Sequence, residues 1–179
     1  LVFNACSKYD DPTKVDNGPG APTTPDTLSA GWTKIGNIPS DESVLDIFFP
    51  DINYGYATTT KGIFRSSNGG LSWDKINTNP GFVNIAASGT KALFVNQTSN
   101  VYNTLNNGSS INSTNIPAYP DSTLFQFHDC FYSSNNTCYL TSGIFMFKSL
   151  NGGITFDTVS RFPTSIHLAK TIFFVNDML

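Results

Sequence analysis

The stretch Ser66–Trp73, which reads SSNGGLSW, has the residue types of a glycine-rich phosphate loop. Such a loop also needs a lysine and a Ser or Thr after its last glycine, and a helix must follow. Here Leu71–Trp73 comes after Gly70, so neither requirement is met. The carbonyl group of Asn68 can instead bond to nearby backbone amides, and the two glycines can adopt positive φ. The sequence therefore predicts a tight turn between two strands.

A second group of residues whose types could take part in catalysis is His128–Cys130, a histidine and an acid beside a cysteine. Neighbours on a strand point to opposite faces, so these residues are not expected to converge as a thiol catalytic site. His128 and His167 lack the spacing of metal ligands, and Asp41-Glu42 and Asp10-Asp11 are adjacent acids that water hydrates. We therefore expect no catalytic residue, metal or cofactor in this chain.

The turn pattern occurs three times in the sequence. Its shared form is Ser or Thr, any residue, Asn, any residue, Gly, any residue, Ser or Thr, and then a bulky apolar residue. A short apolar strand precedes each copy, and a polar strand and a proline follow it. This repetition predicts that the pattern residues hold turns. The residues with this predicted role are Ser66, Asn68, Gly70, Ser72, Trp73, Thr104, Asn106, Gly108, Ser110, Ser149, Asn151, Gly153, Thr155 and Phe156.

Each copy extends into a unit of four short strands. In the first unit we expect strands at about 44–49, 54–60, 63–66 and 72–77. The turns begin about 38 and about 45 residues apart, which is the spacing of four-stranded propeller blades. The predicted fold class is therefore all-β, a partial propeller with antiparallel blades at about 43–80, 82–117 and 124–163.

The repeated turn resembles the Asp-box, the repeat of bacterial neuraminidases and related propellers. Residues 53–76, NYGYATTTKGIFRSSNGGLSWDKI, are similar to the propellers of the photosystem II assembly and stability factor group. The resemblance covers about residues 28–179 and implies a β-propeller. Asn68, Asn106 and Asn151 stand where Asp is usual in the family. Asn keeps the carbonyl oxygen that forms the turn but lacks the charge, so a cation-binding box is not expected.

Two further segments match only parts of a unit. Residues 31–39, GWTKIGNIP, match the outer-strand segment 73–80, but no complete turn precedes them. Residues 166–179 match the start of a unit. We expect the first segment to be the outer strand of a closing blade and the second the inner strand of a next blade. The parent ring is then expected to have about six to eight blades.

The resemblance to sialidases does not extend to their active site. A sialidase of this repeat family needs an arginine cluster, a tyrosine nucleophile with its glutamate, and an acidic proton donor. The arginines of this chain are Arg65 and Arg161, which we expect to be solvated, and the sialidase FRIP motif is absent. This favours a non-enzymatic binding or assembly module for a protein or glycan partner. The alternative is a glycoside hydrolase, sialidase-like or of another Asp-box type, with its catalytic residues in blades beyond this sequence, because fold alone does not determine function.

The N-terminal residues resemble the end of a bacterial lipoprotein signal. In Leu1–Lys8, LVFNACSK, a small residue precedes Cys6, which would carry the lipid. Residues 8–25 are rich in Pro, Gly, Thr and Asp, so residues 1–27 are expected to end in a flexible tether. The acidic residues after the cysteine imply a lipoprotein of Bacteroidetes type, anchored in the cell envelope at the outer membrane and facing the periplasm or the surface. The alternative is a disordered N-terminus that contains a cysteine.

Cys130 and Cys138 flank a polar turn in the third unit. They can form a disulfide if strand register brings their Cβ atoms together, and they are otherwise two buried free thiols.

The composition of the chain excludes two classes of function. The net charge is −3 and 13% of the residues are charged, so there is no basic excess for nucleic acid. No apolar stretch is long enough to span a membrane, so any attachment is expected to be by lipid.

Overall fold

The computed structural model describes residues 36–96, 100–114, 116 and 127–161, together with the backbone of two short strands before them. The predicted lipidation site Cys6, its tether, His167 and segment 166–179 lie outside these residues, so their roles stay predictions. The chain forms two units, Leu1–Gly36 and Asn37–Leu179. Among the described residues, no helix could cross a membrane.

The part of the first unit that the structure describes is a small antiparallel pair of strands. Strand β1 (Thr27–Leu28) pairs with β2 (Trp32–Thr33), with Leu28 opposite Trp32. Strand β2 lies inside segment 31–39, the predicted outer strand of a closing blade. In the described part of the chain, its partner is the strand immediately before it in sequence.

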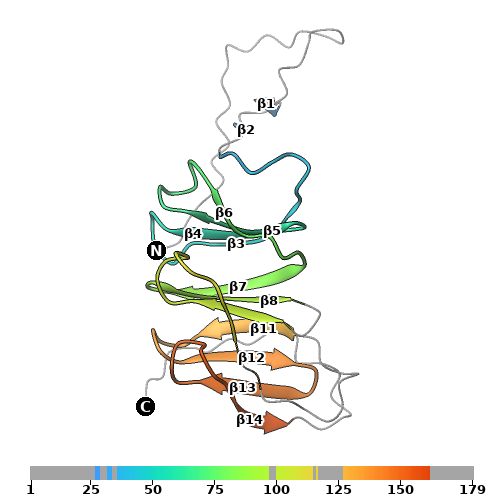
Figure 1. The fold of residues 1–179 in the computed structure, drawn as a ribbon, viewed down its shortest axis with the longest axis vertical. Helices are drawn as coiled ribbons and strands as arrows, with labels where there is room; N and C mark the ends of the chain where they lie inside the picture. The colour runs from blue at the N-terminus through green and yellow to red at the C-terminus, as the bar shows by residue number, and fades with distance from the viewer. Residues whose placement is uncertain are drawn as a thin grey trace. The chain divides into compact units, whose positions relative to one another are not determined.

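In its described residues the second unit contains three antiparallel sheets of four strands, which confirms the all-β, partial-propeller fold class (Figure 1). In each sheet the strands lie side by side in chain order. Sheet 1 consists of β3 (Val44–Phe48), β4 (Gly55–Thr59), β5 (Gly62–Ser66) and β6 (Asp74–Asn77). Sheet 2 consists of β7 (Phe82–Ser88), β8 (Lys91–Asn96), β9 (Val101–Thr104) and β10 (Asn112–Ser113). Sheet 3 consists of β11 (Phe127–Tyr132), β12 (Cys138–Ser142), β13 (Phe145–Ser149) and β14 (Asp157–Arg161).

The sheets pack face to face through apolar side chains. Tyr56 and Ile63 of sheet 1 form a buried cluster with Phe82, Ile85 and Phe94 of sheet 2. Within this cluster, the rings of Tyr56 and Phe94 meet edge to face, with centroids 5.4 Å apart. A second cluster joins sheet 2 to sheet 3, and its members include Leu93, Val95, Phe127, Leu140 and Phe147. Because sheet 2 is covered on both faces, nearly every residue of β8 is buried.

The first strands of the three sheets lie next to one another. Strand β7 contacts both β3 and β11, whereas the fourth strands lie at the far edges of their sheets. We call β3, β7 and β11 the inner strands. Sheets that converge on their first strands and diverge toward their fourth are arranged as blades around an axis.

A short segment before sheet 1 covers part of its free face. Ile38 packs against Ala57, Phe64 and Trp73. The backbone N–H of Trp73 also donates to Oδ1 of Asn37 at 2.6 Å. The inner edge of the same face is open, since Val44 and Ile47 are 49% and 52% exposed.

Candidate functional site

The third repeated turn shows what the pattern residues do. Asn151 Oδ1 accepts hydrogen bonds from the hydroxyl of Ser149 at 2.8 Å and from the backbone N–H of Thr155 at 3.0 Å. Its Nδ2 donates to Oγ1 of Thr155 at 2.8 Å. The Ser149 hydroxyl oxygen accepts from the N–H of Gly153 at 2.9 Å. The asparagine side chain therefore closes the turn on itself, as its short amide can do.

The other two turns repeat these four bonds. In the first and second turns all four donor–acceptor distances lie between 2.8 and 3.1 Å. The pattern hydroxyls and carboxamides thus bond within their own turns. The sequence-predicted residues lie together in each turn, but this arrangement leaves them little capacity for chemistry on a ligand.

Each turn is also tied to the connection between the first two strands of its own sheet. The N–H groups of Gly69, Asn107 and Gly152 donate to the carbonyl oxygens of Asn53, Thr90 and Asn136, each at 2.8 Å. These bonds place both connections at one rim of every sheet. We call this edge the turn rim.

The second and third turns pack against the preceding sheet. A Cβ atom built on Gly108 would lie 3.0 Å from both Arg65 Cδ and Ile76 Cδ1 of sheet 1. The carbonyl oxygen of Gly153 accepts from Asn103 Nδ2 at 3.1 Å and from Thr114 Oγ1 at 2.9 Å in sheet 2. The repeated turns therefore serve two structural purposes, because they close hairpins and join neighbouring sheets.

We expect replacement of Asn151 to separate turn bonding from charge. Asn151→Ala removes three hydrogen bonds and is expected to lower the unfolding free energy by about 1–3 kcal/mol. Asn151→Asp keeps the acceptor oxygen, and the Thr155 hydroxyl can turn to donate to the new carboxylate. This variant should therefore stay within about 1 kcal/mol of the parent at neutral pH.

The aspartate variant should also acquire acid sensitivity. Hydrogen bonds to a carboxylate lower its pKa in the folded state, so the added stability is present above the unfolded pKa of about 3.9 and is lost as pH falls through the folded value. Urea titrations at neutral and acid pH measure this loss. Asn112→Asp, at an exposed residue of β10, is the matched control. Equal acid sensitivity of the two variants would contradict the assigned bonding.

Of the two alternatives for Cys130 and Cys138, the structure has the free thiols, and both are buried. Cys130 lies opposite Leu140, and Cys138 lies opposite Tyr132, so the two cysteines are offset by two residues in register. Diagonal neighbours of this kind have Cα atoms about 7–8 Å apart, beyond the reach of a disulfide. Burial raises the pKa of both thiols, that of Cys138 to about 12, which disfavours the reactive thiolate.

Arg65 differs from its expected role as a solvated residue. Its Nη1 donates to the carbonyl oxygen of Asn107 at 3.2 Å, and its Nη2 lies 3.5 Å from Asp74 Oδ2. The guanidinium therefore joins sheet 1 to the second turn.

Arg161 lies over the ring of Phe145, with its Cζ 5.8 Å from the ring centroid. Neither arginine belongs to a carboxylate-binding cluster in the described residues, and those residues contain no group of His, Cys, Asp and Glu that could hold a metal.

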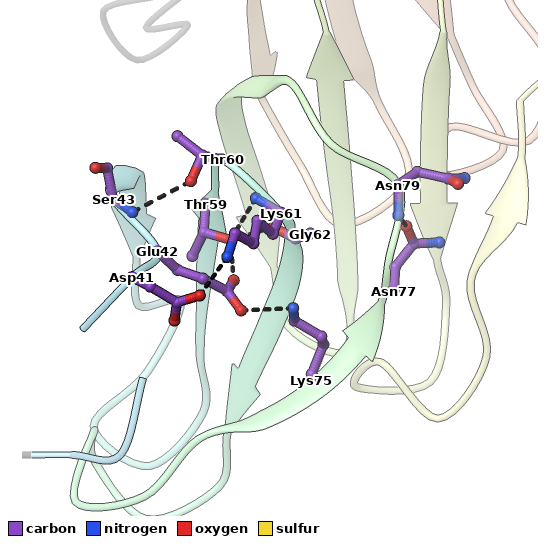
Figure 2. A network of polar contacts seen from close by, with 10 residues as sticks. All are labelled: Asp41, Glu42, Ser43, Thr59, Thr60, Lys61, Gly62, Lys75, Asn77 and Asn79. Carbon is purple, nitrogen blue, oxygen red and sulfur yellow. Dashed lines mark hydrogen bonds and ion pairs between the residues drawn. The ribbon is translucent and has the colours of Figure 1, made fainter. Parts of the chain in front are cut away.

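A polar network occupies the rim opposite the repeated turns (Figure 2). Lys61 pairs with Asp41, and Lys75 donates to Glu42 Oε1 at 2.7 Å. The hydroxyl of Thr59 donates to Glu42 Oε2, also at 2.7 Å. The hydrogen bonds from the two lysines lower the pKa of both acids. These opposite charges neutralise one another. The network therefore serves as a local contact that joins the segment before β3 to the β4–β5 turn and to β6.

The inner strands carry a repeated feature that sequence analysis missed. In each inner strand the pairing with the second strand of the sheet is interrupted by a register shift. The residue directly after this shift has an oxygen atom in its side chain. These residues are Asp46 in β3, Asn84 in β7 and Asp129 in β11. All three side chains are only partly buried. The sequence pattern that could have predicted this feature is an Asp or Asn directly before an apolar or cysteine residue in the first strand of each unit. We call these three residues the inner-wall triad.

Two members of the inner-wall triad connect neighbouring sheets. Asp46 accepts from the N–H of Ile47 and from the N–H of Ile85, both at 2.8 Å. Asn84 Oδ1 accepts from the thiol of Cys130 at 3.1 Å. Partial burial raises the pKa of Asp46, and the negative charge of Asp129 raises it further, against the opposing effect of the two backbone bonds.

Comparison with known proteins supports the fold. No protein-family model matches the chain, and no curated protein matches it in sequence. A structure of YCF48 bound to a D1 peptide is 16% identical, with a TM-score of 0.56 over 68% of this chain and 40% of that one. YCF48 from Cyanidioschyzon merolae is 20% identical, with the same TM-score over 68% of this chain and 38% of that one. An ancestral GH74 enzyme is 18% identical, with a TM-score of 0.58 over 69% of this chain and 19% of that one.

These neighbours and the sheet arrangement define the class of protein. The chain is a partial β-propeller of four-stranded antiparallel blades. It spans less than half the length of each of the three similar structures.

Proposed function

We propose that this chain is a non-enzymatic binding module that recognises a segment of a partner protein along its inner strands. The observation that carries the proposal is the inner-wall triad, with one oxygen-bearing side chain at the same place in each inner strand. The similar structure of YCF48 with a bound D1 peptide supports a protein partner.

The chemistry of the inner-wall triad favours a cationic or amide-rich segment. Carboxylate and carboxamide oxygens accept hydrogen bonds, and Arg or Lys donors to a carboxylate form the stronger charge-assisted type. The net charge of −3 adds a weak long-range attraction for such a segment. Asp129 is the member best suited to testing, since Asp46 also holds sheet 2 through Ile85.

Selection of a displayed random peptide library against the chain tests this proposal. Enriched peptides are expected to contain Arg or Lys, and Asp129→Asn should weaken their binding by about tenfold, the effect of losing one charge-assisted contact. Asp157→Asn, at an exposed residue of the outer strand β14, is the matched control and should bind as the parent does. Enrichment without cationic residues, or equal losses in both variants, would overturn the proposal.

Glycoside hydrolysis is the second candidate function, and one observation favours it. The pKa of Asp46 is raised, chiefly by partial burial, as a general acid requires, and Asp129 supplies a second carboxylate at the same place in another inner strand. The similarity in fold to an ancestral GH74 enzyme agrees with this alternative.

The release of reducing ends from soluble polysaccharides measures hydrolase activity, with Asp46→Asn and Asp129→Asn as the diagnostic variants. Hydrolysis that both variants abolish would favour the enzyme, whereas peptide binding without hydrolysis favours the binding module. Hydrolysis unaffected by either variant would place the catalytic acids elsewhere.

A further inference from the structure

The repeated turns contain three Asn-Gly pairs in two different positions. Asn68-Gly69 and Asn151-Gly152 place the asparagine where the turn needs its side chain. In the second turn, Asn107-Gly108 comes one residue later, because Asn106 already takes that role. Asn-Gly is the most labile asparagine context in proteins, since no side chain shields the glycine nitrogen from the carboxamide carbon. The fold must therefore decide how reactive each pair is.

Asn68 and Asn151 are held by their side chains. Each carboxamide oxygen accepts two hydrogen bonds, and each carboxamide nitrogen donates one. The nitrogen of the following glycine also donates to a backbone carbonyl at 2.8 Å in both turns. The carboxamide must break three bonds before it can rotate toward that nitrogen.

Asn107 is held only through its backbone. Its N–H donates to Thr90, and its carbonyl oxygen accepts from Arg65. Within the part of the chain that the structure describes, its carboxamide takes part in no hydrogen bond. It is also the one non-glycine residue at positive φ among those described, with φ of 54°. This is the left-handed region, which asparagine adopts more readily than most other residues with a side chain. The nitrogen of Gly108 does donate to Thr104 at 2.9 Å, so the difference between the turns lies in the asparagine side chain.

We propose that, of the three Asn-Gly pairs in the repeated turns, Asn107-Gly108 is the one at which the folded chain deamidates. The nitrogen of Gly108 attacks Cγ of Asn107 and loses its proton, the bond from Cγ to the side-chain nitrogen breaks, and ammonia leaves. The resulting succinimide then adds water at one of its two carbonyl carbons and opens to aspartate or isoaspartate. Water is the co-reactant, and no oxidant or cofactor is needed.

The modification affects the contact between sheets 1 and 2. The Asn107 carbonyl accepts from Arg65, and the adjacent Gly108 packs closely against Arg65 and Ile76. Isoaspartate adds a methylene group to the backbone at this point. There is little space for it, because a Cβ atom on Gly108 would already lie only 3.0 Å from Arg65 Cδ and Ile76 Cδ1. We therefore expect the isoaspartate form to melt at a lower temperature than the parent chain.

Incubation of the chain in mildly alkaline buffer, followed by peptide mapping with mass spectrometry, tests the proposal. In the folded chain, Asn107 is expected to deamidate at least about tenfold faster than Asn68 and Asn151, because a single lost hydrogen bond is worth about that factor. In concentrated urea the three rates should converge, since the turns are then absent. Equal rates in the folded chain, or a difference that persists in urea, would overturn the proposal.

Asn107→Gly is the matched variant. It gives the second turn the Asn-Gly-Gly sequence of the other two turns and places a glycine at this positive φ, which glycine adopts readily. Peptide mapping of this variant should find no rapid deamidation in the peptide that contains the second turn, and the fresh protein should keep or exceed the melting temperature of the parent. Deamidation of the second-turn peptide at the parent rate in Asn107→Gly would assign the reaction to another residue.

Discussion

Replacing Ile85 by aspartate is expected to unfold the second unit or remove most of its stability. Ile85 is 5% exposed and lies in the cluster that joins sheets 1 and 2. The described neighbours of this side chain are apolar and offer a carboxylate no cationic partner, and burying an unpaired charged or polar group costs several kcal/mol. The expected loss of about 4 kcal/mol or more is comparable with the total stability of many domains. Urea denaturation followed by far-UV circular dichroism measures it.

Ile47→Asp is the matched control, because the two isoleucines occupy the same place in their strands. Each directly follows the triad residue of its inner strand, yet Ile47 is 52% exposed. The same substitution should therefore cost less than about 1 kcal/mol in this chain. Similar losses at both positions would contradict the assignment of the open face to sheet 1.

The open face also predicts what a longer array would do. Val44 is 49% exposed, whereas Phe82 and Phe127 open the next two inner strands and are fully buried by the preceding sheet. In a protein in which another sheet covers β3, Ile47→Asp should become about as destabilising as Ile85→Asp. An unchanged small effect in that longer protein would show that no sheet covers this face.

Gly153→Ala is expected to have the second large effect. Gly153 has φ of 93°, and a Cβ atom there would lie 2.5 Å from Leu93 Cδ2 in sheet 2. Positive φ costs a residue with a side chain about 1–2 kcal/mol, and overpacking adds about 1–3 kcal/mol. We therefore expect a total loss of about 2–5 kcal/mol, measured as a fall in unfolding free energy.

Gly81→Ala separates the two contributions to that loss. Gly81 has a similar φ of 84°, but a Cβ atom there would meet no atom within 4 Å. Its replacement should cost the backbone contribution alone, about 1–2 kcal/mol. Equal losses at Gly81 and Gly153 would mean that the third turn does not press on sheet 2 as described.

The sequence by itself determined the fold class, because its signals are local. Each turn is closed by bonds between residues at most four positions apart, such as Asn151 with Ser149 and Thr155. Residue types at such short spacing specify a hairpin, and three hairpins at blade spacing specify a propeller. The roles of Cys6 and of segment 166–179 stay predictions, since they lie outside the described residues.

Tertiary structure decided which side chains meet across sheets. Asp46 bonds to the backbone of Ile85, 39 residues away, and Arg65 reaches Asn107, 42 residues away. No local pattern encodes such pairs, because they depend on how far one sheet is displaced along the next. The cysteine pair shows the same limit, since a two-residue offset in register separates Cys130 from Cys138. Hydrogen bonds within a turn depend on local geometry, whereas contacts between sheets depend on register and packing, which only the assembled structure defines.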